Sequence, residues 1–383
     1  MKIVVIIPSL NEEDSISKIV QVIDQGLLKY YPNSDSLILN VDSNSQDKTV
    51  ETFTNTSTYF PKRSIVNKSI PKGKGSNILK AISRFQNADY FLTLDADLVS
   101  AKDIWINKLL TPLITPLIEK KVGLVTPIYT RNRYEGNTTN HFSSPVIYTC
   151  LNKDVTQPIA GDFGFTKKLA FDIPKNIVTT SDHMYGIDTV ITWKAILKEY
   201  KITQVKLGRK IHKPSFPKIV PMFEQVAMTT FRLANQNRHK IVENLNIEAK
   251  DPERHDVIDD KFVQAPHRNK IQEIQQIAIR RLDKYKPPDF VNKGLYKKVQ
   301  IFTEEWTEIL SEYLCFLIKN KLNAIQIESL ARSIVGLYLF RVLGYFDEIS
   351  NITTEKTGNI LFNQKLLLRK RLITNFRKNT FKN

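Results

Sequence analysis

The stretch KIVVIIPSLNEEDSISKIVQVIDQGL, residues 2–27, joins an unbroken run of β-branched residues to a segment with helical spacing. Residues 3–7 are all isoleucine or valine, which is typical of a strand covered on both faces. Between Ser9 and Tyr31, apolar residues recur at intervals of three and four, and this predicts a helix. These residues are Ile16, Ile19, Val20, Ile23 and Leu27. The stretch therefore predicts a β-α unit at the start of the chain.

The same alternation continues through residues 1–100. Short apolar runs predict strands at Leu37–Val41, Ser64–Val66 and Tyr90–Leu94, and helical spacing follows from near Lys48 and over Ser76–Phe85. Alternating strands and helices predict an α/β fold with a doubly wound, mostly parallel sheet. In such folds ligands bind beyond the carboxyl ends of the strands, so polar residues at those ends are the candidates for a site.

The character of the chain changes beyond residue 217. Apolar residues there recur at helical spacing over 224–239, 269–285, 303–322 and 324–346. We therefore expect two domains, an α/β domain at residues 1–217 and a mainly α-helical C-terminal region at residues 218–383, which offers a surface for a homodimer. The last segment, residues 365–383, is rich in lysine and arginine and has no acid, which favours a solvated tail over a membrane-surface segment.

Charge and cysteine content limit the class of protein. The chain has 56 basic and 39 acidic residues and a formal net charge of +17, which favours anionic partners. No nucleic-acid-binding motif accompanies this charge, so we expect no nucleic acid partner. Two cysteines without ligand-like spacing, and an N-terminal apolar run interrupted by Pro8, favour a cytoplasmic protein without a signal peptide. The apolar run 333–346 contains Arg341 and is too short for a transmembrane segment.

Polar residues gather at the predicted strand ends. They are Pro8, Ser9, Asn11 and Glu12; Asp42; Lys72 and Lys74 in the loop PKGKG; and Asp95 and Asp97 in the sequence DAD. Carboxylates suit ribose hydroxyls, lysines suit a diphosphate, and alternate carboxylates suit Mg²⁺ or Mn²⁺. Either motif alone would favour a solvated loop, but their succession favours a nucleotide with a metal on its phosphates. Neither a Walker A nor a G-x-G-x-x-G sequence follows the first strand, which argues against a kinase, an NTPase or a dehydrogenase.

At these segments the sequence resembles the GT-A glycosyltransferases. The resemblance lies in VVIIPSLNEEDSISKIV, NVDSNSQDKTV, PKGKGSNILKAI and LTLDADL, in that order. Three later segments, QPIAGDFGFTKKLA, SDHMYGIDTVITW and GRKIHKPSF, resemble the retaining branch that includes mannosylglycerate synthase, glucosylglycerate synthase and glucosyl-3-phosphoglycerate synthase. The resemblance implies a GT-A fold and a metal-dependent hexosyltransferase with a D-x-D motif.

The resemblance also implies roles for the strand-end residues. Asp97 and His212 would hold Mg²⁺ or Mn²⁺, and Asp95 would contact the sugar or ribose of the donor. The remaining donor-binding residues would be Pro8, Ser9, Asn11, Glu12, Asp42, Lys72 and Lys74. Near His212, Lys210 and Lys213 are expected to favour the diphosphate.

Acceptor binding is expected after the predicted strand 122–128. Arg131 and Arg133 follow this strand, and a guanidinium can bind a planar carboxylate with two hydrogen bonds. A basic solvated loop is the alternative interpretation. The resemblance implies that Arg131, with Thr138 or Thr139, would hold a glycerate-like acid.

Two further carboxylates, Asp162 and Asp188, are candidates for contact with the acceptor hydroxyl and the sugar. Together with Asp95 they are the predicted catalytic residues, with Asp188 orienting the acceptor and Asp162 supporting it. The resemblance implies retention of configuration, most simply by attack on the face from which the diphosphate departs. Related synthases often have glutamate where this chain has Asp162, which leaves the sugar and the acceptor open.

The resulting hypothesis is a retaining transferase. It would move mannose or glucose from a nucleotide diphosphate sugar, such as GDP-mannose or UDP-glucose, to D-glycerate or 3-phosphoglycerate in compatible-solute synthesis. The alternative is a polyprenyl-phosphate glycosyltransferase that acts at a membrane surface.

Overall fold

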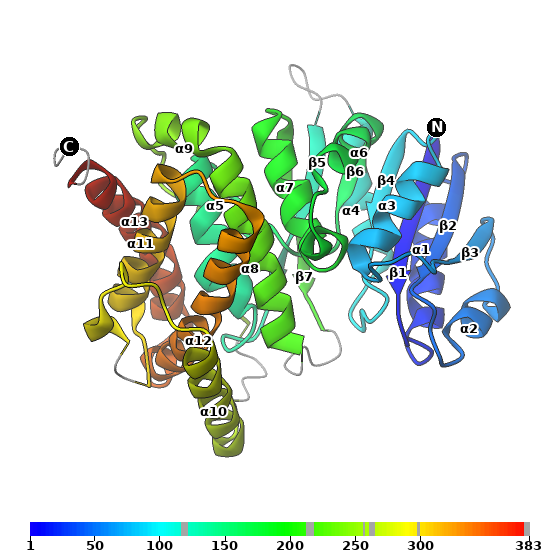
Figure 1. Cartoon of the computed structure of the whole chain (residues 1–383). Coiled ribbons are helices and arrows are strands. Elements are labelled where there is room, and N and C mark those ends of the chain that lie inside the picture. Colours follow the sequence, from blue (N-terminus) through cyan, green and yellow to red (C-terminus); the bar gives the residue numbers. More distant parts are fainter. Residues whose placement is uncertain (116–121, 212–217, 256, 260–264, 297–298, 379–383) are drawn as a thin grey trace. The chain divides into compact units, whose positions relative to one another are not determined.

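The computed structural model divides into two compact units (Figure 1). The first unit comprises residues 1–129 and 157–218, and the second comprises residues 130–156 and 219–383. The structure describes residues 1–115, 122–211, 218–255, 257–259, 265–296 and 299–378. Residues 130–156, which the sequence analysis placed in the α/β domain, are thus grouped with the C-terminal helices. The chain therefore enters the second unit twice.

One sheet organises the first unit. In the described residues it has seven strands in the order β3-β2-β1-β4-β6-β5-β7. The strands are β1 (Lys2–Ser9), β2 (Asp35–Asp42), β3 (Lys62–Val66), β4 (Tyr90–Thr93), β5 (Val122–Thr130), β6 (Gly164–Thr166) and β7 (Lys201–Arg209). β1 pairs in parallel with β2 and β4, and β2 pairs in parallel with β3, whereas β6 runs antiparallel to β4 and β5. The predicted α/β fold with a doubly wound, mostly parallel sheet is confirmed.

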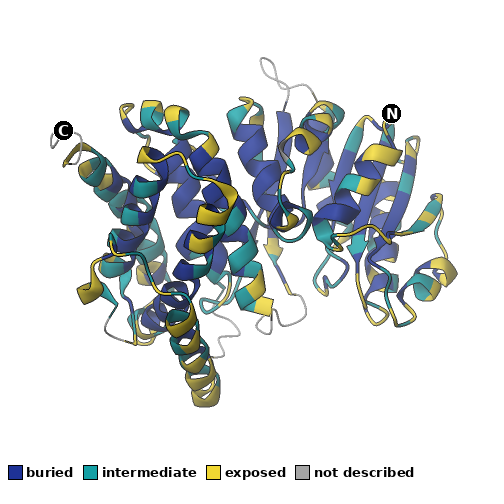
Figure 2. Ribbon diagram, viewed as in Figure 1, coloured by how far each residue is buried: buried dark blue, intermediate teal, exposed yellow. Residues whose placement is uncertain are grey.

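Helices cover the sheet of the first unit. They are α1 (Ile16–Tyr30), α2 (Thr49–Asn55), α3 (Lys74–Arg84), α4 (Asp103–Ile114), α6 (Lys167–Asp172) and α7 (Ile187–Leu197), with short turns η2 (Ile173–Asn176) and η3 (Thr180–His183). The strand order reverses at β1, and right-handed crossovers therefore place α1 and α3 on opposite faces. α1 packs against α4, and α3 contacts α7. Because both faces are covered, residues 3–7 of β1 are fully buried (Figure 2).

The second unit is built from helices. They are η1 (Thr139–Ser143), α5 (Ser144–Leu151), α8 (Ile219–Gln236), α9 (Arg238–Leu245), α10 (Arg268–Lys284), η5 (Lys293–Leu295), α11 (Thr303–Lys319), α12 (Ala324–Ile349) and α13 (Thr354–Lys378). The predicted helical C-terminal region is confirmed. The prediction of a solvated tail is wrong for residues 365–378. These residues belong to α13, which packs against α5 and α11. No described helix combines the length and apolar character that crossing a membrane requires.

Arg369 links α13 to the ends of two other helices. Its guanidinium donates hydrogen bonds to the carbonyl oxygens of Thr149, Asn244 and Ile247, at 2.9, 2.8 and 2.7 Å. These carbonyls lie in the last turn of α5 and around the end of α9, where a helix leaves its own carbonyl groups without partners. The buried arginine therefore completes the hydrogen bonding of both helix ends.

Replacing Arg369 by methionine is expected to lower the free energy of unfolding by about 2–4 kcal/mol, because three carbonyl groups lose a charged donor and Thr149 is fully buried. Lys370, the next residue of α13, is exposed, and Lys370→Met is the matched control with an expected change within about 0.5 kcal/mol. Urea unfolding followed by circular dichroism measures both changes. Equal losses in the two variants would contradict the role given to Arg369.

Candidate active site

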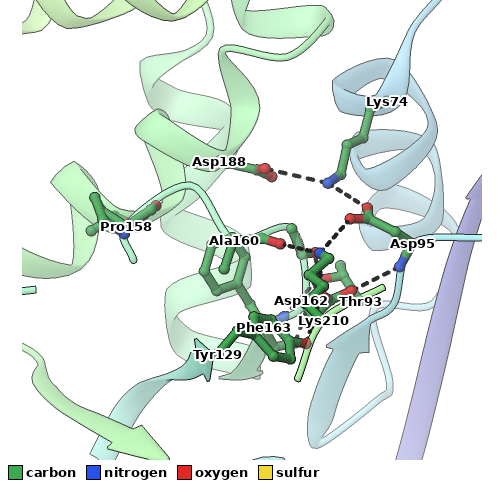
Figure 3. Close-up of polar contacts among 12 residues, drawn as sticks. Lys74, Thr93, Asp95, Tyr129, Pro158, Ala160, Asp162, Phe163, Asp188 and Lys210 are labelled. Carbon is green, nitrogen blue, oxygen red and sulfur yellow. Dashed lines mark hydrogen bonds and ion pairs between the residues drawn. The ribbon is translucent and has the colours of Figure 1, made fainter. Parts of the chain in front are cut away.

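Three carboxylates and two lysines meet at the edge of the sheet where β4 and β5 end (Figure 3). Lys74 Nζ lies 2.7 Å from Asp95 Oδ1 and 3.3 Å from Asp188 Oδ2. Lys210 Nζ lies 3.1 Å from Asp95 Oδ2 and 2.7 Å from Asp162 Oδ2. These five residues form the charged cluster. It unites the three predicted catalytic carboxylates with one predicted donor-binding lysine and with Lys210.

Strand β6 explains the position of Asp162. Because β6 runs antiparallel to β4 and β5, the residues just before it lie at the edge where those strands end. Thr93 of β4 exchanges hydrogen bonds with Phe163, through its backbone N–H at 2.8 Å and its hydroxyl at 3.0 Å. Asp162 Oδ1 then accepts the backbone N–H of Asp95 at 2.9 Å. β6 therefore brings two carboxylates together that are far apart in the sequence.

The PKGKG loop brings Lys74 into the cluster. The backbone N–H of Gly75 donates to the carbonyl oxygen of Met184 at 3.2 Å. A Cβ atom at Gly75 would lie 2.3 Å from the carbonyl oxygen of Asp182, so glycine is needed for this close approach. The loop therefore packs against the segment that leads into α7 and Asp188, and Lys74 reaches both Asp188 and Asp95.

Asp162 is fully buried and both its oxygens are occupied. Besides the amide of Asp95 on Oδ1, its Oδ2 accepts the hydroxyl of Tyr129 at 2.8 Å and the ammonium of Lys210 at 2.7 Å. Lys210 also donates to the carbonyl oxygen of Ala160 at 2.8 Å. These contacts give Asp162 no exposed surface for a ligand, and they hold Asp95 in place.

Asp188 has a different environment. The residue is 6% exposed, and its buried Oδ1 has no hydrogen-bond partner among the described residues. Burial, together with the negative charge of Asp95, raises the pKa of Asp188 to about 6, although Lys74 acts in the opposite direction. A buried acceptor atom without a partner is costly. Oδ1 of Asp188 is therefore a candidate contact for a ligand hydroxyl.

Asp95 and Lys74 are held in their charged forms. Burial alone would raise the pKa of Asp95, but the charges of Lys74 and Lys210 lower it below its usual range. Burial alone would lower the pKa of Lys74, but the charges of Asp188 and Asp95 raise it above its usual range. The pair therefore offers a fixed cation and a fixed anion at neutral pH.

Asp42 joins the ends of β1 and β2. It is buried, and its Oδ2 accepts hydroxyl hydrogen bonds from Ser9 at 2.9 Å and from Ser45 at 2.6 Å. Its Oδ1 accepts the backbone N–H of Ser45 at 2.7 Å. Pro8 is half-buried beside Ser9. The structure thus places the predicted nucleoside-binding residues Pro8, Ser9 and Asp42 together, and Asp42 forms a direct hydrogen bond with Ser9.

The segment after β1 contacts the segment after β2. Asn11 adopts a left-handed backbone conformation with φ of 56°, and its Oδ1 accepts the backbone N–H of Gln46 at 2.9 Å. Glu12 Oε2 accepts the hydroxyl of Ser15 at 2.9 Å. Lys72 is exposed in the PKGKG loop. Their predicted roles in donor binding stay predictions.

The predicted metal ligands are Asp97, which is half-buried beyond β4, and His212, which lies outside the described residues. Within the described ranges, no three His, Cys, Asp or Glu side chains gather in a group that could hold a metal ion. Lys74 and Lys210 each bind one oxygen of Asp95, and the role of Asp97 as the metal-ligating acid of the motif stays a prediction. A carboxylate oxygen fits Mg²⁺, which commonly takes one or two protein carboxylates together with phosphate oxygens and water.

The two arginines predicted to bind an acceptor belong to the second unit. Arg131 pairs through its backbone with residues 257–259. Arg133 Nη1 donates to the carbonyl oxygens of Ile349 and Ile352, at 3.1 and 2.7 Å. These contacts stabilise the end of α12 and the β-bridge, and acceptor binding by the arginines stays a prediction.

The two threonines predicted for the acceptor also lie in the second unit. The hydroxyl of Thr138 lies 3.0 Å from the hydroxyl of Tyr338, and both residues are buried. Thr139 is buried in η1. Their surroundings are those of core residues, and their role in acceptor binding is likewise untested.

Gly161 allows the turn around the charged cluster. Its φ is +89°, and a Cβ atom there would lie 2.4 Å from Asp95 Oδ2 and 2.7 Å from Lys74 Nζ. Gly208 has a similar φ of +83°, but no atom lies within 4 Å of the place that a Cβ atom would take there. Both positions would strain the backbone of an alanine, but only the position of Gly161 would also bring its methyl group into a steric clash. Comparing the two substitutions therefore isolates the cost of the clash.

Gly161→Ala is expected to lower the free energy of unfolding by about 1–3 kcal/mol more than Gly208→Ala, because only the first methyl group must displace the buried ion pair. Chemical unfolding of both variants measures the difference. Equal losses would mean that the cluster adapts to the added methyl group without cost.

The sequence analysis gave one residue of this site a different role and missed another. Lys210 was expected to favour a diphosphate, but the structure buries it against Asp95, Asp162 and Ala160. Tyr129 was not considered, because no motif in the sequence around it indicates a residue of a functional site. Its position depends on β5 lying next to β6, a pairing that the sequence pattern does not predict.

Comparison with known proteins shows which family model and which solved structures the chain resembles. Residues 4–185 match the family model described as Glycosyl transferase family 2. The chain is similar to crystal structures of glucosyl-3-phosphoglycerate synthase from Mycobacterium tuberculosis, which is a GT-A glycosyltransferase. The predicted resemblance to GT-A glycosyltransferases, and the GT-A fold, are confirmed.

Two of these structures give the extent of the similarity. One is a complex with Mn²⁺, UDP and phosphoglyceric acid, and the other is a complex with Mn²⁺, UDP and glucosyl-3-phosphoglycerate. Both have a TM-score of 0.50 and 21% sequence identity, and the matches cover 61% of this chain and 78% and 79% of theirs. No curated protein sequence matches the chain significantly.

Proposed function

We propose that the chain is a metal-dependent, retaining glycosyltransferase. It moves a hexose, glucose or mannose, from a nucleotide diphosphate sugar to a small hydroxy acid. The observation that carries this proposal is the charged cluster, which joins Lys74 of the PKGKG loop to Asp95 of the DAD motif and to Asp188. The match of residues 4–185 to Glycosyl transferase family 2 supports the reaction class.

Asp95 is suited to bind the hydroxyl groups of the donor. Each of its oxygens accepts one lysine N–H, from Lys74 or from Lys210. A carboxylate has about four lone-pair sites, so two further hydrogen bonds remain available to it. The side chain keeps 24% of its surface exposed, which lets a sugar or ribose hydroxyl reach it.

Asp97 and His212 are the residues that would hold Mn²⁺ or Mg²⁺. A cation at this position would neutralise the negative charge that develops on the departing diphosphate. The similar structures with a TM-score of 0.50 contain Mn²⁺ together with UDP, which supports a metal ion beside a nucleotide diphosphate.

Lys74 and Asp188 have complementary tasks in the transfer. When the bond between the anomeric carbon and the phosphate oxygen breaks, the fixed charge of Lys74 favours the anion that leaves. Oδ1 of Asp188 accepts a hydrogen bond from the acceptor hydroxyl and orients it. For retention, the departing phosphate oxygen takes the hydroxyl proton on the same face, so no protein nucleophile is required. Asp162, with both oxygens occupied, supports Asp95.

The acceptor is proposed to be D-glycerate or 3-phosphoglycerate, and the product a compatible solute or its phosphorylated precursor. The net charge of +17 suits such anionic substrates. A structure of the similar synthase with a TM-score of 0.50 and 20% identity contains Mn²⁺, UDP-glucose and phosphoglyceric acid, which supports a phosphorylated acid and UDP-glucose as the first pair to test.

The test is a matrix of donors and acceptors. GDP-mannose, UDP-glucose, GDP-glucose and ADP-glucose are each incubated with D-glycerate or 3-phosphoglycerate, with Mn²⁺ or Mg²⁺ and with a chelator. Metal-dependent transfer to one acid, with the anomeric configuration of the donor retained in the product by NMR, is expected. Metal-dependent hydrolysis of a donor without transfer would reject the hydroxy acids and favour a polyprenyl phosphate. No turnover of any donor would reject the proposed function.

A further inference from the structure

Lys210 is a buried cation whose hydrogen bonds are all used inside the protein. The residue is 5% exposed. Its ammonium group donates to Asp162 Oδ2 at 2.7 Å, to the carbonyl oxygen of Ala160 at 2.8 Å and to Asp95 Oδ2 at 3.1 Å. It also lies 5.1 Å from the centre of the Tyr129 ring. Since an ammonium group has three donors, none remains for a phosphate.

The neighbouring residue attaches the same part of the chain to the far side of the DAD motif. The backbone N–H of Ile211 donates to the hydroxyl of Ser100 at 2.8 Å, and its carbonyl oxygen accepts the N–H of Val99 at 2.9 Å. Lys210 meanwhile binds Asp95 through its side chain. The end of β7 therefore contacts the chain before and after Asp97.

These contacts have a geometric consequence for Asp95. Lys74 holds one carboxylate oxygen and Lys210 holds the other, so the carboxylate plane is fixed from two sides. The amide of Asp95 is fixed as well, by Asp162 Oδ1 at 2.9 Å. A neutral side chain in place of Lys210 would free one oxygen of Asp95 and would leave the fully buried Asp162 with no cation.

We propose that Lys210 is a positioning residue, which fixes Asp95 and the Ala160–Asp162 turn to the end of β7 and thereby aligns the DAD motif with the donor. This inference rests on the proposed function, because the donor gives the alignment its purpose. Lys210 does not contact the donor and acts through Asp95 and Asp162. The residue thus differs from Lys74, whose charge faces the leaving group.

The charge of Lys210 also acts on Asp188, which provides a readout that a purely structural residue would not change. Burial and three charged groups set the ionisation of Asp188. Burial and Asp95 raise its pKa, whereas Lys74 and, more weakly, Lys210 lower it. Removing the charge of Lys210 is therefore expected to move the pKa of Asp188 upward from about 6.

Two variants distinguish the effect of the charge of Lys210 from the effect of the position of its ammonium group. Lys210→Met keeps the length of the side chain and removes its charge, whereas Lys210→Arg keeps the charge with a larger, planar group that cannot occupy the same three contacts. Lys206→Met is the matched control, since Lys206 is an exposed residue of β7, the strand that ends just before Lys210. Each protein is compared by thermal unfolding, by steady-state kinetics and by calorimetric binding of UDP with Mn²⁺. The pKa of Asp188 is read from its carboxyl ¹³C NMR signal, assigned by its absence in Asp188→Asn.

In Lys210→Met we expect kcat to fall roughly 10²-fold, because misplacement of reacting groups costs about that much. The ratio of donor hydrolysis to transfer should rise, and the Asp188 pKa should move upward. In Lys210→Arg, kcat should fall while the Asp188 pKa stays close to that of the wild type. Lys206→Met should match the wild type throughout.

A folded Lys210→Met protein with wild-type kcat and wild-type Asp188 pKa would overturn the proposal. If Lys210→Met does not fold, Lys210→Arg decides, and wild-type kcat in that variant would overturn it. If the wild-type protein transfers no sugar, the proposed function fails on its own. The binding and NMR measurements then still decide, because unchanged UDP–Mn²⁺ affinity and unchanged Asp188 pKa would remove Lys210 from any positioning role.

Discussion

Asp188→Asn is expected to reduce kcat for transfer by roughly 10²-fold to 10³-fold, because an amide cannot replace the anionic acceptor atom that orients the substrate hydroxyl. The affinity for the donor should change less, since Asp95 and the PKGKG loop remain. Steady-state kinetics with saturating donor measure the loss. A kcat within about threefold of the wild type would contradict the role assigned to Oδ1, since it would amount to well under 1 kcal/mol of transition-state stabilisation.

The same residue predicts the pH dependence of the wild-type enzyme. Asp188 orients the hydroxyl only when it is ionised, and burial raises its pKa to about 6. The rate should therefore fall as the pH drops below about 6. A profile of kcat from pH 5 to pH 9 should show this decrease at acidic pH in the wild type. The profile of Asp188→Asn should be flat over the same range.

The stability of the fold should change with pH in the opposite direction. The folded-state pKa of Asp188 lies above its ordinary value of 3.8, so the proton binds more tightly to the folded protein. The contribution of this group to stability is therefore present below about pH 4 and is lost as the pH rises through about 6. Unfolding measurements across this window should show the decline in the wild type and a smaller decline in Asp188→Asn.

Asp97→Asn is expected to abolish most metal-dependent transfer, with a loss of roughly 10²-fold to 10³-fold in kcat, because the charge on the departing diphosphate loses its main counter-charge. Binding of Mn²⁺ in the presence of UDP, followed by electron paramagnetic resonance, should weaken in parallel. This second measurement does not depend on knowing the acceptor.

A suitable control is Asp103→Asn, which lies a few residues further along the chain. Asp103 forms a surface ion pair with Lys29, with 2.9 Å between Nζ and Oδ2. Surface pairs contribute about 0–1 kcal/mol, so this variant should keep its activity and its Mn²⁺ affinity. Undiminished Mn²⁺ binding by Asp97→Asn would show that the DAD motif holds no metal through this residue.

The parts of the fold that could be predicted from sequence are those with local patterns. The β-branched run at residues 3–7 and the spacing of apolar residues in α1 depend on neighbours within the same element. β6 could not be predicted, because it has only three residues and exists through pairing with β4 and β5. α13 was missed for another reason. Its arginines look solvated in a sequence, whereas Arg369 is buried against carbonyl groups.

The features of the candidate site likewise divide into those that a local sequence pattern predicts and those that depend on distant contacts. The sequence analysis named Lys74, Asp95, Asp162 and Asp188, since each stands beside a recognisable motif or strand end, and the structure brings them together. It did not predict that Asp162 is occupied on both oxygens or that Lys210 is the cation between two acids. These facts depend on contacts between residues far apart in the sequence, which no local pattern encodes.

The contacts of α13 bear on how the protein is made. Gln364 donates to the carbonyl oxygen of Asn140, and Arg369 donates to that of Thr149, across 224 and 220 residues of chain. During translation, residues 130–156 leave the ribosome long before α13 exists to cover them. The second unit can therefore close only after α13 has been synthesised, and until then residues 130–156 lack these partners. Shortening the chain before residue 369 would leave nascent α5 without this cover.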